Sequence, residues 1–155
     1  MREMHAAELM TPDPVTVERR TSVPEVAEEL ARHDIGGVPV VESRRDRRLV
    51  GMITDRDIAV RCVARGHHPV ECDAASHMSR HVVTAQVDED LAHVMRKMEG
   101  GQVRRIPVVD RAGRVIGIIA QADLAVEAVR ENTISELDVA HTLQRISLPA
   151  HPERM

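Results

Sequence analysis

Two aspartates, Asp57 and Asp123, occupy matching places in the chain, each just after an apolar run that is interrupted by one glycine. The first run ends at Thr54, three residues before Asp57, and both runs lead into segments apolar enough to form a helix. Free N–H groups and a partial positive charge at a helix N-terminus suit a phosphate, and a carboxylate there can accept hydrogen bonds from ribose hydroxyls. Thr and Asp are also common helix caps, so capping is the alternative reading.

The elements that must position these residues recur along the chain. Each half is predicted to run strand, helix, strand, strand, helix. In the first half we expect a turn at 11–14, a strand at 15–17, a helix starting at Ser22, strands at 38–41 and 49–53, and a helix over 55–64. In the second half we expect strands near 82–85, 106–109 and 114–119, and helices over 90–99 and 121–130. A last helix is expected to begin with a capping box of Thr133 and Glu136 and to bury Ile134, Leu137, Ala140 or His141, and Leu143.

A tandem repeat explains this recurrence. Gly51 and Gly117 are 66 residues apart, as are Asp57 and Asp123, whereas Met10 and Met78 are 68 apart. The change from 68 to 66 falls in the loop at 42–48, which is two residues longer in the first copy. The predicted organisation is therefore repeat 1 at 7–65, a connection at 66–77, repeat 2 at 78–130, and a C-terminal helix and tail at 131–155.

Composition limits the possible partners. The chain has 155 residues, of which 43% are apolar and none is Phe, Tyr or Trp, so the core must be aliphatic. Without aromatic rings the chain cannot stack on bases, and a net charge of −4 gives no general attraction to nucleic acid or to an anionic membrane. No apolar run is long enough to span a bilayer, and residues 1–9 hold no apolar signal core. We expect a cytoplasmic protein with no nucleic-acid or membrane partner.

The repeated residues resemble a pair of CBS domains, often called a Bateman module. The resemblance covers roughly residues 7–130 and rests on Gly-Val-Pro-Val-Val at 37–41, Arg-Ile-Pro-Val-Val at 105–109, and the Gly-x-x-Thr-x-x-Asp stretch at 51–57. The runs at 33–36 and 54–58 resemble short stand-alone bacterial CBS proteins, including the hypoxic-response type. This resemblance implies an α/β fold of two pseudo-symmetric β-α-β-β-α repeats packed sheet to sheet.

The family resemblance also implies two clefts between the copies that bind adenine nucleosides or nucleotides. By position, the first cleft would use Asp57 for ribose and Thr54 for phosphate, with Arg56 in reach, and its adenine wall would be Met78, Val83 and Val103. The second cleft would use Asp123 for ribose and Arg105 for phosphates, and its adenine wall would be Met10, Val15 and Ile35.

The sequence departs from the family pattern once in each copy. Ala120 stands where a hydroxyl residue is expected, and Gly37 stands where an arginine matching Arg105 could stand. A charge-assisted bond to phosphate contributes about 1.5–3 kcal/mol and a neutral hydroxyl bond about 1 kcal/mol, which favours the second cleft for phosphate. The complete motif and Arg56 favour the first, and we expect the first cleft to be preferred.

Two further groups of residues can each be interpreted either as a binding site or as ordinary solvated surface. Cys62, His67, His68, Cys72, His77 and His81 lie around the connection, and thiolate with imidazole suits zinc. Their spacing matches no compact zinc motif, so we expect a solvated connection with one buried cysteine and no metal ligands. The arginines of the loop at 42–48 are expected to be a solvated tip, with an anionic partner as the alternative.

Taken together, these residues predict a non-enzymatic regulatory module with no required cofactor. No nucleophile stands beside an activating base. The expected ligand is an adenine nucleotide such as AMP or ATP, with roles in energy sensing or stress response, and the expected assembly is a homodimer that signals to an unknown protein target. An interaction scaffold with empty clefts and a metal-binding stress protein remain the alternatives.

Overall fold

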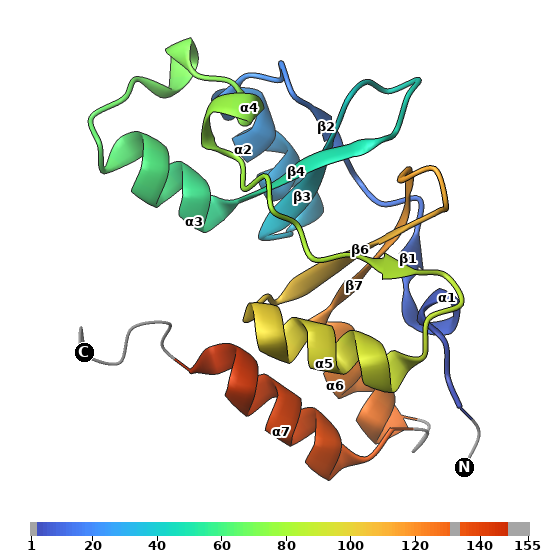
Figure 1. Ribbon diagram of the computed structural model, residues 1–155. Helices are drawn as coiled ribbons and strands as arrows, with labels where there is room; N and C mark the ends of the chain where they lie inside the picture. The colour runs from blue at the N-terminus through green and yellow to red at the C-terminus, as the bar shows by residue number, and fades with distance from the viewer. Residues whose placement is uncertain (1–2, 131–133, 149–155) are drawn as a thin grey trace. The chain divides into compact units, whose positions relative to one another are not determined.

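The computed structural model describes residues 3–130 and 134–148 (Figure 1). Within these residues the chain forms two compact units, which are described separately. The first unit holds Asp13–Val82 and Arg111–Val115, and the second holds the described parts of Met1–Pro12, Val83–Asp110 and Ile116–Met155. Each repeat therefore gives its N-terminal segment to the unit that is built mainly from the other repeat.

The first unit is a three-stranded sheet with helices. The sheet order is β2-β3-β4, in which β2 is parallel to β3 and β3 is antiparallel to β4. The elements are β2 (Val17–Glu18), α2 (Val23–His33), β3 (Gly37–Val41), β4 (Leu49–Thr54), α3 (Asp55–Asp57), the π-helix η1 (Ile58–Val63), the 3₁₀ helix η2 (Pro69–Glu71) and α4 (Ala74–His77).

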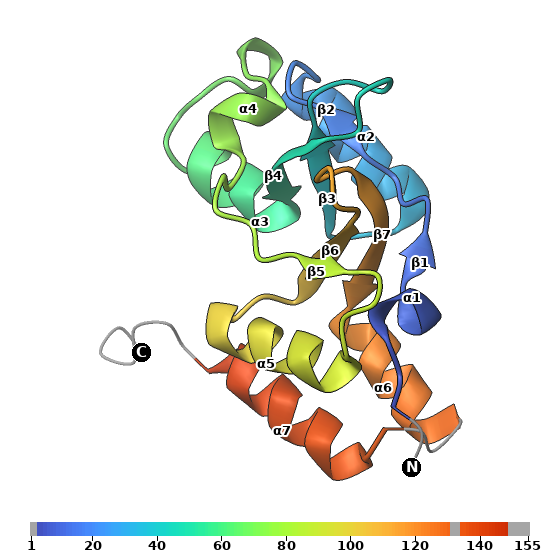
Figure 2. The ribbon, with the colours of Figure 1, turned by 45° about the vertical axis from the view of Figure 1, so that its right-hand side comes forward.

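The second unit is a four-stranded sheet with order β1-β7-β6-β5, in which β1 is antiparallel to β7 and β5 is parallel to β6. Its elements are α1 (Ala6–Leu9), β1 (Thr11–Pro12), β5 (Ala85–Gln86), α5 (Leu91–Gly101), β6 (Arg105–Val109), β7 (Val115–Ala120), α6 (Gln121–Arg130) and α7 (Glu136–Ser147). Helix α7 packs against α5 and α6, and Figure 2 shows α5 and α7 side by side.

Backbone hydrogen bonds confirm that the two units follow one plan. In the second unit Ala6 N–H donates to Glu89 O at 2.9 Å, and in the first unit Ala74 N–H donates to Thr21 O at 2.8 Å. The donors Ala6 and Ala74 are 68 positions apart, as are the acceptors Thr21 and Glu89, which is the spacing of the sequence repeat. The mixed α/β fold with two sheets, predicted from the repeat, is therefore present.

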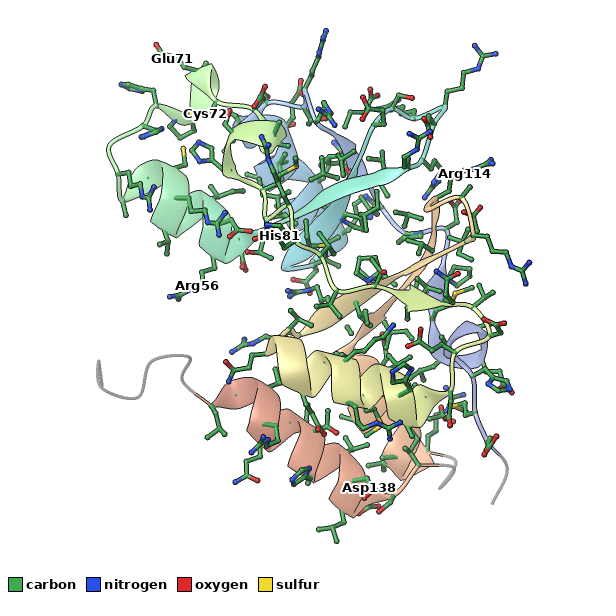
Figure 3. All side chains as sticks on the ribbon, in the orientation of Figure 1. Arg56, Glu71, Cys72, His81, Arg114 and Asp138 are labelled. Atoms are coloured by element: carbon green, nitrogen blue, oxygen red, sulfur yellow. The ribbon has the colours of Figure 1, made fainter. Side chains whose placement is uncertain are left out.

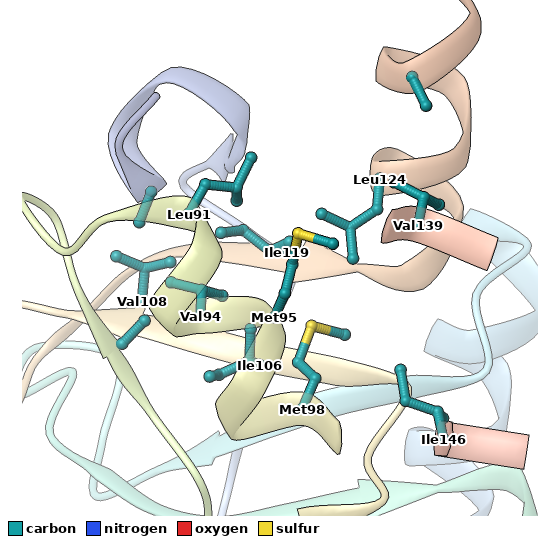
Figure 4. Close-up of a cluster of buried hydrophobic side chains, with 13 residues drawn as sticks. Leu91, Val94, Met95, Met98, Ile106, Val108, Ile119, Leu124, Val139 and Ile146 are labelled. Atoms are coloured by element: carbon teal, nitrogen blue, oxygen red, sulfur yellow. The ribbon is translucent and has the colours of Figure 1, made fainter. Parts of the chain in front are cut away.

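An aliphatic core fills each unit, as the composition requires. In the first unit Val26 and Leu30 of α2 pack with strand residues such as Ile53. In the second unit Val94 and Met98 of α5 pack with strand residues such as Ile119 (Figure 4). None of the helices in the described residues is long and apolar enough to cross a membrane.

The buried face of α7 differs from the prediction. Val139, Thr142 and Ile146 are buried, while Leu137 is 78% exposed. Ile134 and Leu143 do pack against the core as partly buried residues. The helix is capped by Ser135, whose hydroxyl accepts from Asp138 N–H at 3.3 Å. The predicted cap residue Thr133 lies outside the described residues.

Smaller differences concern helix type and strand limits. The predicted helix over 55–64 begins as α3 and continues as the π-helix η1. The predicted turn at 11–14 contains β1, because Thr11 pairs with Ile118 and Pro12 with Gly117. The first strand lies at 17–18 rather than 15–17. Pairing with neighbouring strands, which local sequence does not encode, decides these limits.

The loop at 42–48 is solvated only in part, which corrects the expectation of a free loop tip. Arg44 is 93% exposed. Arg47, however, forms an ion pair with Asp13 at 2.6 Å and donates to Pro14 O at 3.3 Å. Its own carbonyl accepts from Val115 N–H at 2.9 Å. Arg47 therefore ties this loop to two other segments of the first unit.

Candidate functional site

Thr54 and Asp57 form a reciprocal capping box where β4 passes into α3. The Thr54 hydroxyl accepts from Asp57 N–H at 3.1 Å, and Asp57 Oδ2 accepts from Thr54 N–H at 2.9 Å. The turn is held to the start of β3, because Asp55 N–H donates to the carbonyl of Gly36, the residue just before that strand, at 2.9 Å. Asp57 therefore has a capping role whether or not it also binds a ligand.

Asp123 caps the matching turn in the second unit. Its Oδ2 accepts from Ala120 N–H at 2.7 Å, and Gln121 N–H donates to Arg104 O at 2.9 Å. Ala120 has no hydroxyl that could accept a hydrogen bond from Asp123 N–H. The second turn thus has half of the side-chain capping box that the first has.

One residue near Asp57 was missed by sequence reasoning. Arg61 Nε lies 3.6 Å from Asp57 Oδ1, and the guanidinium donates to Met78 O at 3.4 Å. The spacing of four residues on a helix was the signal that could have found this pair. Arg56, by contrast, is exposed and extends away from α3 (Figure 3).

Two of the predicted wall residues, Met78 and Met10, pack on glycines of their own unit. A side chain on Gly51 would collide with Met78, and its Cβ would lie 2.9 Å from Ser79 O. Gly117 meets Met10 in the same way in the second unit. These glycines let a methionine lie directly on the strand.

Ile35 and Val103 are placed by matching turns after α2 and α5. Ile35 N–H donates to Leu30 O at 3.0 Å, and Val103 N–H donates to Met98 O at 3.1 Å, as in a Schellman motif. Ile35 is left 37% exposed. Val15, Val83, Val103 and Arg105 are half-buried.

The predicted ligand residues are divided between the units. The first unit holds Thr54, Arg56, Asp57, Met78, Val15 and Ile35, and the second unit holds Met10, Val83, Val103, Arg105 and Asp123. Within the first unit, Met78 also lines a surface hollow of about 550 Å³ together with Arg61, Ser79 and Arg80. The roles of these residues toward a ligand stay predictions.

The connection between the repeats is not simply solvated, which corrects the expectation for its cysteines and histidines. His77 is 4% exposed and Cys72 is half-buried, so Cys62 is not alone inside. Burial lowers the pKa of His77, and His67 lowers it further. Burial and the neighbouring Cys62 raise the pKa of the Cys72 thiol.

Comparison with known proteins settles the family. A family model described as CBS domain matches residues 6–63 and again residues 73–130. The chain belongs to the CBS-domain family. It is 34% identical over 138 residues to the CBS domain-containing protein YhcV of Bacillus subtilis, which covers 89% of this chain and 91% of YhcV.

An enzyme also contains a similar region. Inosine-5'-monophosphate dehydrogenase of Streptococcus pyogenes is 36% identical over 113 residues, which covers 72% of this chain but only 22% of the dehydrogenase. The chain therefore corresponds to a small part of that enzyme, and the match does not extend to the rest of it.

Solved structures of CBS pairs share the fold. Hypoxic response protein I, with two coordinated zinc ions, is 30% identical and covers 79% of this chain and 97% of its own, with a TM-score of 0.72. The CBS pair of protein MJ0100, in complex with 5'-methylthioadenosine and S-adenosyl-L-methionine, is 31% identical and covers 80% and 94%, with a TM-score of 0.72. The resemblance to short stand-alone CBS proteins is thereby confirmed.

Proposed function

We propose that this chain is a non-enzymatic regulatory CBS pair that binds an adenosine-containing ligand of the AMP, ADP or ATP class. The observation that carries the proposal is the strand-to-helix turn that recurs in both units, each capped by an aspartate three residues after the strand ends. In the proposal Asp57 and Asp123 accept hydrogen bonds from ribose hydroxyls in the two family clefts, and no cofactor is required.

Capping and ligand binding are compatible at Asp57 and at Asp123. A carboxylate offers about four lone-pair positions, and each cap uses one oxygen of its aspartate. The Thr54 hydroxyl accepts from Asp57 N–H, and its own O–H can still donate to a phosphate oxygen. The first site therefore keeps the groups that a ribose phosphate needs.

The two sites are proposed to differ in how they hold phosphate. The first offers the Thr54 hydroxyl and the exposed Arg56, and the second offers Arg105 without a hydroxyl at Ala120. The walls proposed for the adenine ring are apolar at both sites, because Met78 packs over Gly51, Met10 packs over Gly117, and Ile35 is partly exposed. The solved complex of the CBS pair of MJ0100 with 5'-methylthioadenosine and S-adenosyl-L-methionine supports the adenosine class of ligand.

Signalling is proposed to run through a homodimer and a protein target. Exposed valines recur at matching places in the helices, Val60 and Val63 on η1 and Val126 and Val129 on α6. A ligand that binds two arrangements of the chain with different affinity would shift the population between them. Energy sensing, a role in stress response, bacterial origin and a cytoplasmic location are parts of the same proposal.

Calorimetric titration with AMP, ATP and S-adenosylmethionine tests the ligand class. Asp57→Ala should weaken binding at the first site by roughly 2–4 kcal/mol, and Asp123→Ala should do so at the second site alone. Asp90→Ala is the matched control, because Asp90 caps α5 through Ala92 N–H at 3.0 Å and has no proposed ligand role.

Stability does not separate a ligand role from capping, because all three aspartates are caps, and truncation of each should cost about 0.5–2 kcal/mol. Affinity is the readout that decides. Wild-type affinity in both Asp57→Ala and Asp123→Ala would refute the ribose role, and no binding by the wild-type chain would leave an interaction scaffold with empty clefts.

A further inference from the structure

Three potential metal-binding side chains meet inside the first unit, outside the proposed nucleotide sites. The Sγ atoms of Cys62 and Cys72 and a ring nitrogen of His77 all lie within 4.8 Å of one another. Cys62 is completely buried, and His77 is 4% exposed. They come from three different elements, the π-helix η1, the turn after η2, and the end of α4.

Backbone hydrogen bonds hold the three elements in place. After η1 the chain reverses at Gly66, whose φ of 75° is left-handed, and His67 N–H donates to Cys62 O at 3.0 Å. Cys72 O accepts from Val23 N–H at 2.9 Å (Figure 3 marks Cys72 between η2 and α4). Asp73 caps α4 through Ser76 N–H at 3.0 Å, which fixes the helix that ends at His77.

His77 carries a second, independent sign of a ligand. Its Nε2 is buried and has no hydrogen-bond partner among the described residues. A buried polar atom without a partner is costly in a native protein and calls for an explanation such as a bound ion. An imidazole nitrogen with a free lone pair, together with two cysteine sulfur atoms, forms a set of donors that suits a zinc ion.

The second unit supplies an internal comparison for the three positions. By the repeat spacing, Cys62 corresponds to Ala128, Cys72 to Met4 and His77 to Leu9. The local backbone is the same, because Leu91 N–H donates to Met4 O at 2.8 Å as Val23 N–H does to Cys72 O. Ala128 belongs to the apolar core cluster of the second unit, and Met4 and Leu9 pack against that cluster as partly buried residues. The second unit thus fills the three corresponding positions with apolar side chains, so the packing of this fold does not require two thiols and an imidazole there.

We propose that Cys62, Cys72 and His77 bind one zinc ion, with His67 as the fourth ligand. In a tetrahedral zinc site with these donors the ligand atoms lie about 3.3–3.8 Å apart, so the cluster needs only a small contraction. Two imidazoles on one tetrahedral ion hold their ring centroids about 5.2 Å apart. The His67 and His77 centroids are 5.4 Å apart, and His67 is exposed, so its ring is able to turn toward the ion.

A disulfide between Cys62 and Cys72 is the competing state of the same thiols. It would leave His77 Nε2 without a partner, whereas zinc satisfies all three groups at once. Two thiolates and two imidazoles also give a neutral zinc centre, which suits a buried position. The distinction can be measured, because a disulfide removes two hydrogens and holds no metal.

The test uses the full chain purified without a histidine tag, under reducing conditions. Metal analysis should find one zinc per chain, and exchange with Co²⁺ should give visible d–d bands of tetrahedral cobalt with thiolate charge-transfer absorption. The triple variant Cys62→Ala, Cys72→Met, His77→Leu copies the second unit, and it should fold, as judged by circular dichroism, and bind no zinc. His81→Ala, which removes an exposed histidine outside the cluster, is the matched control and should keep the metal.

Two further measurements locate the ligands. Chelation should lower the melting temperature of the wild-type chain and leave that of the triple variant unchanged. His67→Ala should weaken zinc affinity roughly tenfold or more. Loss of a residue that only orients a metal ligand already weakens affinity by about tenfold or more, and loss of a ligand itself should have at least that effect. Equal zinc content in the wild-type chain and the triple variant, cobalt spectra without thiolate absorption, or a metal-free disulfide in the intact mass would overturn the proposal. Unchanged affinity in His67→Ala would overturn the assignment of the fourth ligand.

Discussion

Substitution of Ala120 by threonine should convert the second turn into a copy of the first. In the first unit Thr54 and Asp57 exchange two capping bonds, at 2.9 and 3.1 Å, whereas the second has the single bond of 2.7 Å from Ala120 N–H to Asp123. The new hydroxyl would accept from Asp123 N–H. Position 120 ends a strand and is only half-buried, so a β-branched residue fits there.

The expected gain in stability follows from this one bond. A cap of this kind contributes about 0.5–2 kcal/mol, and because threonine ranks below serine, asparagine and aspartate as a cap, we expect about 0.5–1 kcal/mol here. For a chain of this length, each kcal/mol shifts the melting temperature by about 2–4 °C. Ala120→Thr should therefore raise the melting temperature of the ligand-free chain by roughly 1–4 °C, which differential scanning calorimetry can resolve.

The same hydroxyl should also strengthen phosphate binding at the second site. A neutral hydroxyl bond contributes about 1 kcal/mol, which is about a fivefold change in Kd. Titration of Ala120→Thr with AMP and with adenosine separates the two effects, because only AMP carries the phosphate. Thr54→Val should produce the opposite change at the first site.

Ala120→Val is the control, since valine has the shape of threonine without the hydroxyl. If Ala120→Val stabilises the chain as much as Ala120→Thr, the gain comes from the branched side chain and the capping argument is wrong. If Ala120→Thr changes AMP and adenosine affinity equally, phosphate does not lie at this turn.

Two further predictions concern the surface. Arg47→Ala should lower the free energy of unfolding by about 1–2 kcal/mol, because the hydrogen bond of Arg47 to Pro14 O is long for a charged donor and the ion pair with the 84% exposed Asp13 adds little. Arg44→Ala should change the free energy of unfolding by less than about 0.5 kcal/mol. Equal urea midpoints for the two variants would show that Arg47 is as solvated as Arg44 and does not hold the loop. Val63→Asp combined with Val129→Asp should give monomers by light scattering at micromolar concentration. The wild-type chain and the control Val70→Asp, which replaces a valine on η2 that is as exposed as Val129, should be dimers. A monomeric wild-type chain would count against the homodimer.

Local sequence determined the elements and their caps. The strands at 37–41 and 105–109 and the helices α2 and α5 follow directly from apolar periodicity and from the cap residues Ser22 and Asp90. The repeat spacing also placed Asp57 and Asp123 at matching turns. These features depend on residues within a few positions of each other, and such short-range preferences are encoded locally.

Tertiary structure decided which segments pack together. Helix α4 follows repeat 1 and precedes repeat 2 in sequence, and nothing in its four residues says that it packs in the first unit while α1 packs in the second. The contact of Arg47 with Asp13 and the buried face of α7 likewise depend on partners far away in sequence. Hydrophobic periodicity indicates that a face is buried, but it does not name what covers that face.

The cluster of Cys62, Cys72 and His77 likewise depends on both sequence and tertiary structure. The sequence provides two thiols and an imidazole, but at a spacing that matches no compact zinc motif. The reversal at Gly66 and the bond from Val23 N–H to Cys72 O close the distance between them. Sequence therefore supplied the chemistry of these donors, and only the packing of η1 against α4 brought them to within 4.8 Å, because convergence of ligands is a property of the folded chain.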